Sequence, residues 1–171
     1  MANLSEDGWR AKLKQLMRDT DYDLAEEICF RRLRENPDDS LYLTSLGRIA
    51  WEKGDRRDAI IMYRKATQAS SENIEAWVLL SGVLIDGGQL ESAEAALGEA
   101  LGLNASSIEA RKLLAYLYTR TDRVPEAVHI FESLRKEKAE DPTILEGIGN
   151  AYRMIGRRES AVEAYCSWAT L

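Results

Sequence analysis

The sequence predicts an all-α protein, built as a solenoid of five antiparallel helix-turn-helix units. The first observation behind this prediction is a period of about 34 residues, which is typical of a repeat array. The second is the apolar spacing within each period, which forms two helical blocks separated by a turn. The third is a content of only three prolines in 171 residues, which leaves room for long helices.

The stretch from Ser40 to Asn73 sets the register of the repeat, because its small and bulky positions recur one period later. Leu46, Gly54 and Ala59, for example, are matched by Leu80, Gly88 and Ala93. This register divides residues 1–171 into a single array of five units: 6–39, 40–73, 74–107, 108–141 and 142–171.

Within the second unit, Leu43, Leu46 and Ile49 share one face of a first helix, and Ala59 and Tyr63 share one face of a second helix. Glycines in the turns suit the left-handed backbone that ends a helix, and short polar residues before the next helix suit its N-cap. The turn glycines are Gly54, Gly88 and Gly156, and the expected caps of first helices are Asp39 or Ser40, Asn73 and Asp141.

An alanine stands at the same place in the second helix of every unit. We expect it to face a small residue of the first helix, so that the two backbones approach closely. The alanines are Ala25, Ala59, Ala93, Ala127 and Ala161, and the facing residues are Gly47, Ser81, Ala115 and Gly149.

The two end units depart from the pattern. The first has Leu13 at a place where a small residue is expected, and Lys12 and Arg32 at places that are usually apolar or small, which predicts a solvated terminal unit. The last helix is unusually apolar for an outer surface, so either Trp168 covers the open edge of the array itself, or this helix is an oligomer interface. The residues of that candidate interface are Val162, Tyr165, Trp168 and Leu171.

Charge and composition exclude several classes of function. A net charge of −6 and a pI near 5.0 disfavour nucleic-acid binding, which needs clustered cations. The N-terminus lacks the basic and apolar run of a signal peptide, and the apolar run Trp77 to Ile85 is too short to span a membrane. Two distant cysteines favour free thiols in a reducing compartment, so we expect a cytoplasmic protein.

No enzymatic site, cofactor or metal is expected from the residues present. The one histidine, His129, has no second histidine or cysteine at ligand spacing and is interpreted as a solvated helix residue. Cys29 takes a bulky core place in its unit and is interpreted as a packed thiol.

The repeat resembles the tetratricopeptide repeat family, whose pattern of large and small residues is matched piecewise along the chain. The resemblance implies a right-handed superhelix whose first helices line a concave groove, and it implies that the protein binds other proteins. The matching residues are Trp77, Leu46, Gly47, Tyr118, Ala59, Phe131, Ala66 and Pro37.

By this resemblance, ligand contacts come from the exposed face of each first helix. Apolar anchors flanked by cations suit a peptide or helix that carries hydrophobic and acidic residues. The alternative is that these aromatic residues only fill a narrow superhelix and that the arginines pair with neighbouring acids. The same places of the first unit hold Asp7, Arg10, Lys14, Met17 and Arg18, and the candidate binding residues are Arg48, Trp51, Val78, Ile85, Lys112, Tyr116, Arg120, Asn150 and Arg153.

Cochaperones of this family hold a C-terminal carboxylate with lysine, asparagine and arginine at fixed places of three units. Those places hold other residues here, so binding of heat-shock-protein tails is not expected. The residues at these places are Thr44, Arg48, Leu79, Glu109 and Leu113.

The favoured function is therefore a non-enzymatic adaptor, scaffold or chaperone that binds another protein. The alternative is a self-assembling scaffold, or a fragment of a larger protein, that associates through its last helix. Residues 74–107 hold five acids and no base, and residues 40–73 hold six bases and four acids. This uneven distribution either favours head-to-tail or staggered self-association, or arises by chance in short segments.

Overall fold

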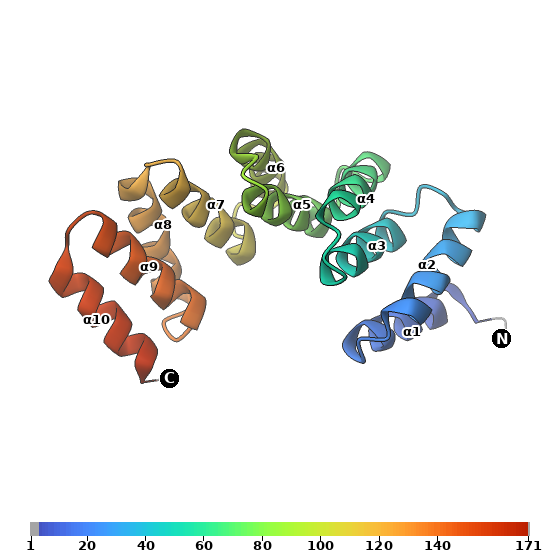
Figure 1. The fold of residues 1–171 in the computed structure, drawn as a ribbon, viewed down its shortest axis with the longest axis horizontal. Helices are drawn as coiled ribbons and strands as arrows, with labels where there is room; N and C mark the ends of the chain where they lie inside the picture. The colour runs from blue at the N-terminus through green and yellow to red at the C-terminus, as the bar shows by residue number, and fades with distance from the viewer. Residues whose placement is uncertain (1–3, 171) are drawn as a thin grey trace. The chain divides into compact units, whose positions relative to one another are not determined.

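The computed structural model describes residues 4–170, and this range contains ten α-helices and no strand (Figure 1). The predicted all-α fold is confirmed. The odd-numbered helices begin at the residues that the repeat register gives as the first of each unit. The helices are α1 (Glu6–Arg18), α2 (Tyr22–Glu35), α3 (Ser40–Glu52), α4 (Arg56–Ala69), α5 (Ile74–Asp86), α6 (Leu90–Leu103), α7 (Ile108–Arg120), α8 (Val124–Glu137), α9 (Pro142–Met154) and α10 (Arg158–Ala169).

The chain forms two compact parts, Met1–Val83 and Leu84–Leu171, and the division falls within α5. In the first part, α2 packs on α1 and on α3, and α3 packs on α4. In the second part, each helix from α6 to α10 packs on the next, and α7 also contacts α9. Each part is therefore a stack of helix pairs, and a single uninterrupted array stays a prediction.

The same backbone conformation makes the turn of every helix pair. Gly54, Gly88 and Gly156 have φ values of 85°, 73° and 76°, as the sequence predicts. The corresponding residues of the other two pairs, Thr20 and Asp122, also have positive φ values of 57° and 61°. A left-handed residue ends the first helix and lets the chain reverse, so all five turns share one geometry.

Short polar residues cap the first helices, as predicted. Asp39 accepts a hydrogen bond from the backbone amide of Leu41, and Asn73 accepts one from Ala76, both at 3.0 Å. Asp141 accepts from the amide of Thr143 at 2.9 Å. These caps satisfy amides that have no partner inside the helix, so they fix where each first helix begins.

The closest approach within a helix pair differs from the prediction. A Cβ atom placed on Gly47 would lie 2.5 Å from the ring of Tyr63, and one placed on Gly149 would lie 2.6 Å from the ring of Tyr165. The recurring alanine, such as Ala59, is buried, but it is not the nearest neighbour of the glycine. The aromatic ring of the second helix is therefore what requires a glycine on the first.

The expectation of a solvated first unit is wrong at Leu13. Leu13 is buried, and it belongs to the same apolar cluster as Cys29, which takes the place that Tyr63 has in the next unit. A small residue on the second helix leaves room for a large one on the first. Burial also raises the pKa of the Cys29 thiol to about 12, which agrees with a packed, unreactive cysteine.

Replacing Gly47 with alanine should destabilise the protein, because the added methyl group would overlap the buried ring of Tyr63. We expect a loss of about 1 to 3 kcal/mol in the free energy of unfolding, measured by urea denaturation. Gly98 is the matched control, since a Cβ there meets nothing within 4 Å. Gly98→Ala should be neutral or stabilise by up to about 1 kcal/mol, because alanine favours a helix interior. Equal effects of the two substitutions would contradict the assigned packing.

Candidate functional site

The exposed faces of α1 and α3, together with the start of α5, form a groove in the first part of the chain. Its volume is about 650 Å³. We call it the N-terminal groove. It is lined by Arg10, Leu13, Lys14, Met17, Arg18, Leu41, Thr44, Ser45, Arg48, Asn73 and Glu75.

One wall of the N-terminal groove is fixed by a polar network between α3 and α5. The side-chain amide of Asn73 donates to the hydroxyls of Ser40, at 2.7 Å, and Thr44, at 3.1 Å. The hydroxyl of Ser40 donates in turn to the backbone carbonyl of Ala66 at 2.8 Å. Because Asn73 also caps α5, this network positions the starts of α3 and α5 together.

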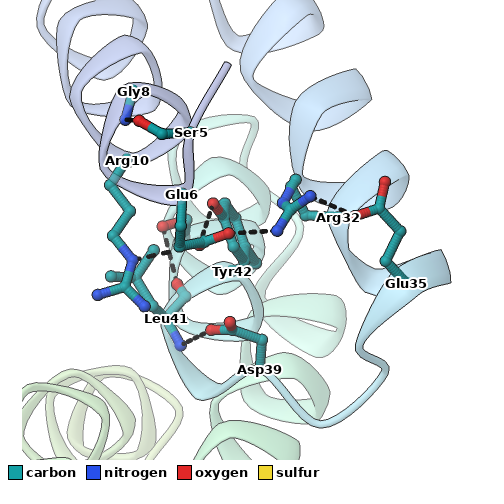
Figure 2. Close-up of polar contacts among 10 residues, drawn as sticks. Ser5, Glu6, Gly8, Arg10, Arg32, Glu35, Asp39, Leu41 and Tyr42 are labelled. Carbon is teal, nitrogen blue, oxygen red and sulfur yellow. Dashed lines mark hydrogen bonds and ion pairs between the residues drawn. The ribbon is translucent and has the colours of Figure 1, made fainter. Parts of the chain in front are cut away.

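The position of α1 is fixed by a second polar network, in which Glu6 of α1 contacts Arg32 of α2 and Tyr42 of α3 (Figure 2). Tyr42 of α3 donates a hydrogen bond to Glu6 at 2.9 Å. Arg32 of α2 pairs with both Glu6 and Glu35, and Arg10 of α1 contacts Glu6 at 3.3 Å. The Arg32 side chain is only 19% exposed, and within residues 4–170 its Nε atom has no hydrogen-bond partner. The two ion pairs of its terminal nitrogens explain why an arginine is tolerated at a place that is usually apolar or small.

The same contacts shift the pKa values of Glu6 and Tyr42. Burial disfavours a charged Glu6, but the hydrogen bond from Tyr42 and the nearby Arg10 and Arg32 outweigh it, so the pKa of Glu6 lies below its ordinary value of 4.5. Burial and the carboxylate of Glu6 raise the pKa of Tyr42 to about 12. The network therefore keeps Glu6 ionised and Tyr42 protonated at neutral pH.

The exposed faces of α7 and α9 form a groove of about 320 Å³ in the second part. We call it the C-terminal groove. Three of the residues predicted to bind a partner, Lys112, Tyr116 and Asn150, line this one groove. Its full lining is Glu109, Lys112, Leu113, Tyr116, Thr119, Phe131, Thr143, Glu146, Gly147 and Asn150.

Each of these three residues offers a different kind of contact. The side chain of Tyr116 is 47% exposed and presents its ring to the groove. Lys112 lies 2.8 Å from Glu109 and 3.6 Å from Asp141, so its charge is balanced. The carbonyl oxygen of Asn150 accepts from Tyr165 at 2.7 Å, and its amide nitrogen has no partner within residues 4–170.

Phe131 shapes the floor of the C-terminal groove from α8. A Cβ atom on Gly147 would lie 2.5 Å from its ring, so a glycine is needed for the ring to lie against α9. The ring is almost fully buried. The floor is therefore apolar and rigidly supported.

The other predicted binding residues lie elsewhere. Arg48 lines the N-terminal groove, whereas Trp51, Arg120 and Arg153 are exposed but line neither groove. Val78 is half-buried. Ile85 is only 1% exposed, so the prediction that it lines an open surface is wrong. Its place in the last turn of α5 belongs to the core rather than to the exposed face.

The cations of α1 were not among the predicted binding residues, although they stand at the same repeat places as the others. The signal was therefore present in the register. The candidate binding residues were instead taken from the other four units. The residues concerned are Arg10, Lys14 and Arg18, with Met17 between them.

The last helix exposes part of its predicted apolar surface. Val162 is 60% exposed and Trp168 is 46% exposed. Tyr165 points inward instead, with its ring against Gly149 and its hydroxyl on Asn150. Leu171 lies outside the described residues.

Candidate metal ligands and membrane-spanning helices were sought among residues 4–170. Within residues 4–170, no group of three or more histidine, cysteine and acidic side chains could hold a metal ion. No helix in this range is both long and apolar enough to cross a bilayer. His129 is exposed and lies at the edge of a shallow cavity beside Ile130.

Repeated helix pairs with grooves on their first helices define a helical-repeat protein. Residues 50–107 and 91–149 match the tetratricopeptide repeat model, and together these stretches span more than half of the chain. The chain therefore belongs to the tetratricopeptide repeat family. Members of this family are generally interaction modules rather than enzymes.

Solved structures with the same fold support this assignment. MamA is 23% identical, with a TM-score of 0.79 and coverage of 92% of each chain. PilF of Pseudomonas aeruginosa is 17% identical, with a TM-score of 0.85, covering 96% of this chain and 75% of that one. YrrB, described as a TPR protein with an unusual peptide-binding site, is 20% identical, with a TM-score of 0.76 and coverages of 94% and 83%. No curated protein matched the sequence. At these identities the likeness establishes the fold.

Replacing Tyr42 with phenylalanine should weaken the attachment of α1, because Glu6 loses its hydrogen bond from α3. We expect a loss of about 1 kcal/mol in unfolding free energy at pH 7, measured by urea denaturation. A lowered pKa means that ionised Glu6 contributes stability above about pH 4.5, and that this contribution is lost as the pH falls through the pKa of the folded state. The difference between the variant and the wild type should therefore shrink in acid.

Tyr22→Phe is the control for this prediction, since the Tyr22 hydroxyl makes no hydrogen bond within residues 4–170. This variant should stay within about 0.5 kcal/mol of the wild type at every pH. If Tyr42→Phe is as stable as the control at every pH, the claim that Glu6 anchors α1 through Tyr42 is contradicted.

Proposed function

We propose that this protein is a non-enzymatic adaptor or scaffold that binds a peptide segment of a partner protein on the exposed faces of its first helices. The C-terminal groove carries this proposal, because it brings together Lys112, Tyr116 and Asn150 from two successive first helices. Apolar and amide groups that converge on one hollow are typical of a binding site.

The groove offers both an anchor and an orienting contact for a peptide. The ring of Tyr116 and the apolar floor at Phe131 suit one large apolar side chain of the ligand. The free amide nitrogen of Asn150 suits a backbone carbonyl, because it donates without requiring a particular side chain. The hydrogen bond from Tyr165 holds Asn150 in place, so the donor is already oriented before the ligand arrives.

The charge of the C-terminal groove does not favour one sign of ligand. Lys112 is balanced by Glu109 and Asp141, and Glu146 adds a further acid to the lining. Recognition there depends on shape and on hydrogen bonding. The peptide-binding role described for YrrB, which shares the fold, agrees with this proposal.

Self-association through α10 is a second candidate function. Val162 and Trp168 are both largely exposed on this helix, and exposed apolar side chains in one helix mark a contact surface. A chaperone role belongs to the same proposal as the adaptor, since both need only a bound protein segment.

The cytoplasm is the proposed location. Both cysteines are free, with Cys29 buried and Cys166 exposed. An exposed free thiol is typical of a reducing compartment.

Capture of partners from a lysate of the native cell tests the proposed groove. Tyr116→Ala should lower the amount of each specific partner by about ten-fold or more, because an aromatic anchor contributes about 2 kcal/mol. The full chain is immobilised, and each variant is first shown to retain its helical content and melting temperature.

Trp168→Asp is the control and also tests self-association. Retained capture with Trp168→Asp and lost capture with Tyr116→Ala supports the groove. Undiminished capture by Tyr116→Ala contradicts the proposed site. Loss of capture only with Trp168→Asp, together with a dimer that this substitution dissociates in light scattering, favours the self-associating scaffold.

A further inference from the structure

The N-terminal groove has the opposite charge to the protein as a whole. The chain carries a net charge of −6, yet four cations and one acid line this groove. The acid is Glu75, and the cations are Arg10, Lys14, Arg18 and Arg48. A concave cationic surface on an acidic protein favours an anionic ligand at that place and disfavours it elsewhere.

Lys14, Arg18 and Arg48 are available to a ligand, and Arg10 is held only by a partly exposed ion pair with Glu6 at 3.3 Å. Arg48 lies 3.6 Å from Glu75, and both side chains are about half exposed or more, so this pair contributes about 0 to 1 kcal/mol. Within residues 4–170, Lys14 and Arg18 have no ion pair. A ligand carboxylate can therefore bind them without breaking a stable contact.

The spacing of the cations specifies the form of the ligand. Arg10, Lys14 and Arg18 are four residues apart on α1, so they follow one another along its face at intervals of about 6 Å. Alternate residues of an extended peptide are about 6.7 Å apart and point the same way. Carboxylates at every second position of an extended peptide would thus meet successive cations of α1.

Apolar residues lie between the charged ones. Met17 on α1 and Leu41 on α3 both line the groove, and Leu41 is partly exposed. A ligand that fits must therefore carry apolar side chains as well as acids. This mixture favours a peptide over a single-stranded nucleic acid, since Met17 and Leu41 are aliphatic and offer no aromatic ring on which a base could stack.

We propose that the N-terminal groove binds an extended acidic segment of a partner protein, with carboxylates at alternate positions and apolar side chains between them. This inference rests on the proposed function, since it assumes that first-helix faces bind peptides. It gives the two grooves different tasks. The N-terminal groove selects acidic sequence, and the C-terminal groove, where Lys112 is already paired, does not.

Fluorescence anisotropy with a defined probe tests this proposal on the full chain. The probe is a labelled twelve-residue peptide with glutamate at every second position and leucine or serine between. Its counterpart carries glutamine in place of glutamate. We expect the glutamate peptide to bind at least about ten-fold more tightly at low salt, and the difference to fall as salt screens the exposed charges.

A matched pair of variants separates the groove from the overall charge. Lys14→Gln with Arg18→Gln should weaken binding of the glutamate peptide by about ten-fold, the equivalent of two exposed charge contacts. Arg57→Gln with Arg64→Gln removes the same charge from exposed positions of α4 outside the groove. This control should change the affinity by less than about three-fold.

Three results would overturn the inference. They are equal binding of the glutamate and glutamine peptides, equal weakening by the groove and control variants, and equally tight binding of a twelve-nucleotide thymidine strand. The proposed function fails separately, since it is tested by the Tyr116-dependent capture of partners. If partner capture still depends on Tyr116 but the glutamate peptide does not bind, the proposed function stands. Only the proposed preference of the N-terminal groove for acidic sequence is then contradicted.

Discussion

The contact between an aromatic ring of the second helix and a glycine of the first helix sets how closely two of the helix pairs pack, α3 on α4 and α9 on α10. Tyr63 lies on Gly47 in the first part of the chain, and Tyr165 lies on Gly149 in the second. Two other pairs, α1 with α2 and α7 with α8, hold different residues at the same places. Cys29 shares a buried cluster with the larger Leu13, and Phe131 shares one with Ala115. In these four pairs, a large side chain on one helix is matched by a smaller residue on the other, as a closely packed interior requires.

This packing leaves the opposite face of each first helix free, and the two parts use that face differently. In the first part, Glu6 anchors α1 through Tyr42 and Arg32, and the cations of α1 are presented to a groove. In the second part, Tyr165 both packs on Gly149 and orients Asn150 towards a groove that is more apolar. The residues that build the fold thus also position the residues that can bind.

Much of the fold could be predicted from the sequence, because the repeat period, the turn glycines and the polar caps are local signals. The same register identified Lys112, Tyr116 and Asn150, which do line one groove. Ile85 was misplaced because a repeat place specifies only an approximate direction, and burial depends on neighbours that the period does not reveal. The α1 cations stand at the same repeat places as the candidate binding residues, so their sequence signal was present although they were left out of that set. Leu13 was interpreted as a sign of a solvated end. Leu13 is buried because the facing residue of α2, Cys29, is small, and this match depends on packing between helices that the repeat period does not reveal.

A double-mutant cycle between Gly47→Ala and Tyr63→Leu tests the ring-on-glycine contact most directly. If the ring causes the cost of the added methyl group, that cost should largely disappear once leucine replaces the ring. We expect a coupling energy of about 1 to 2 kcal/mol in the unfolding free energies from urea denaturation. Additive effects, with a coupling below about 0.5 kcal/mol, would show that Tyr63 is not what requires a glycine at position 47 and would contradict this account.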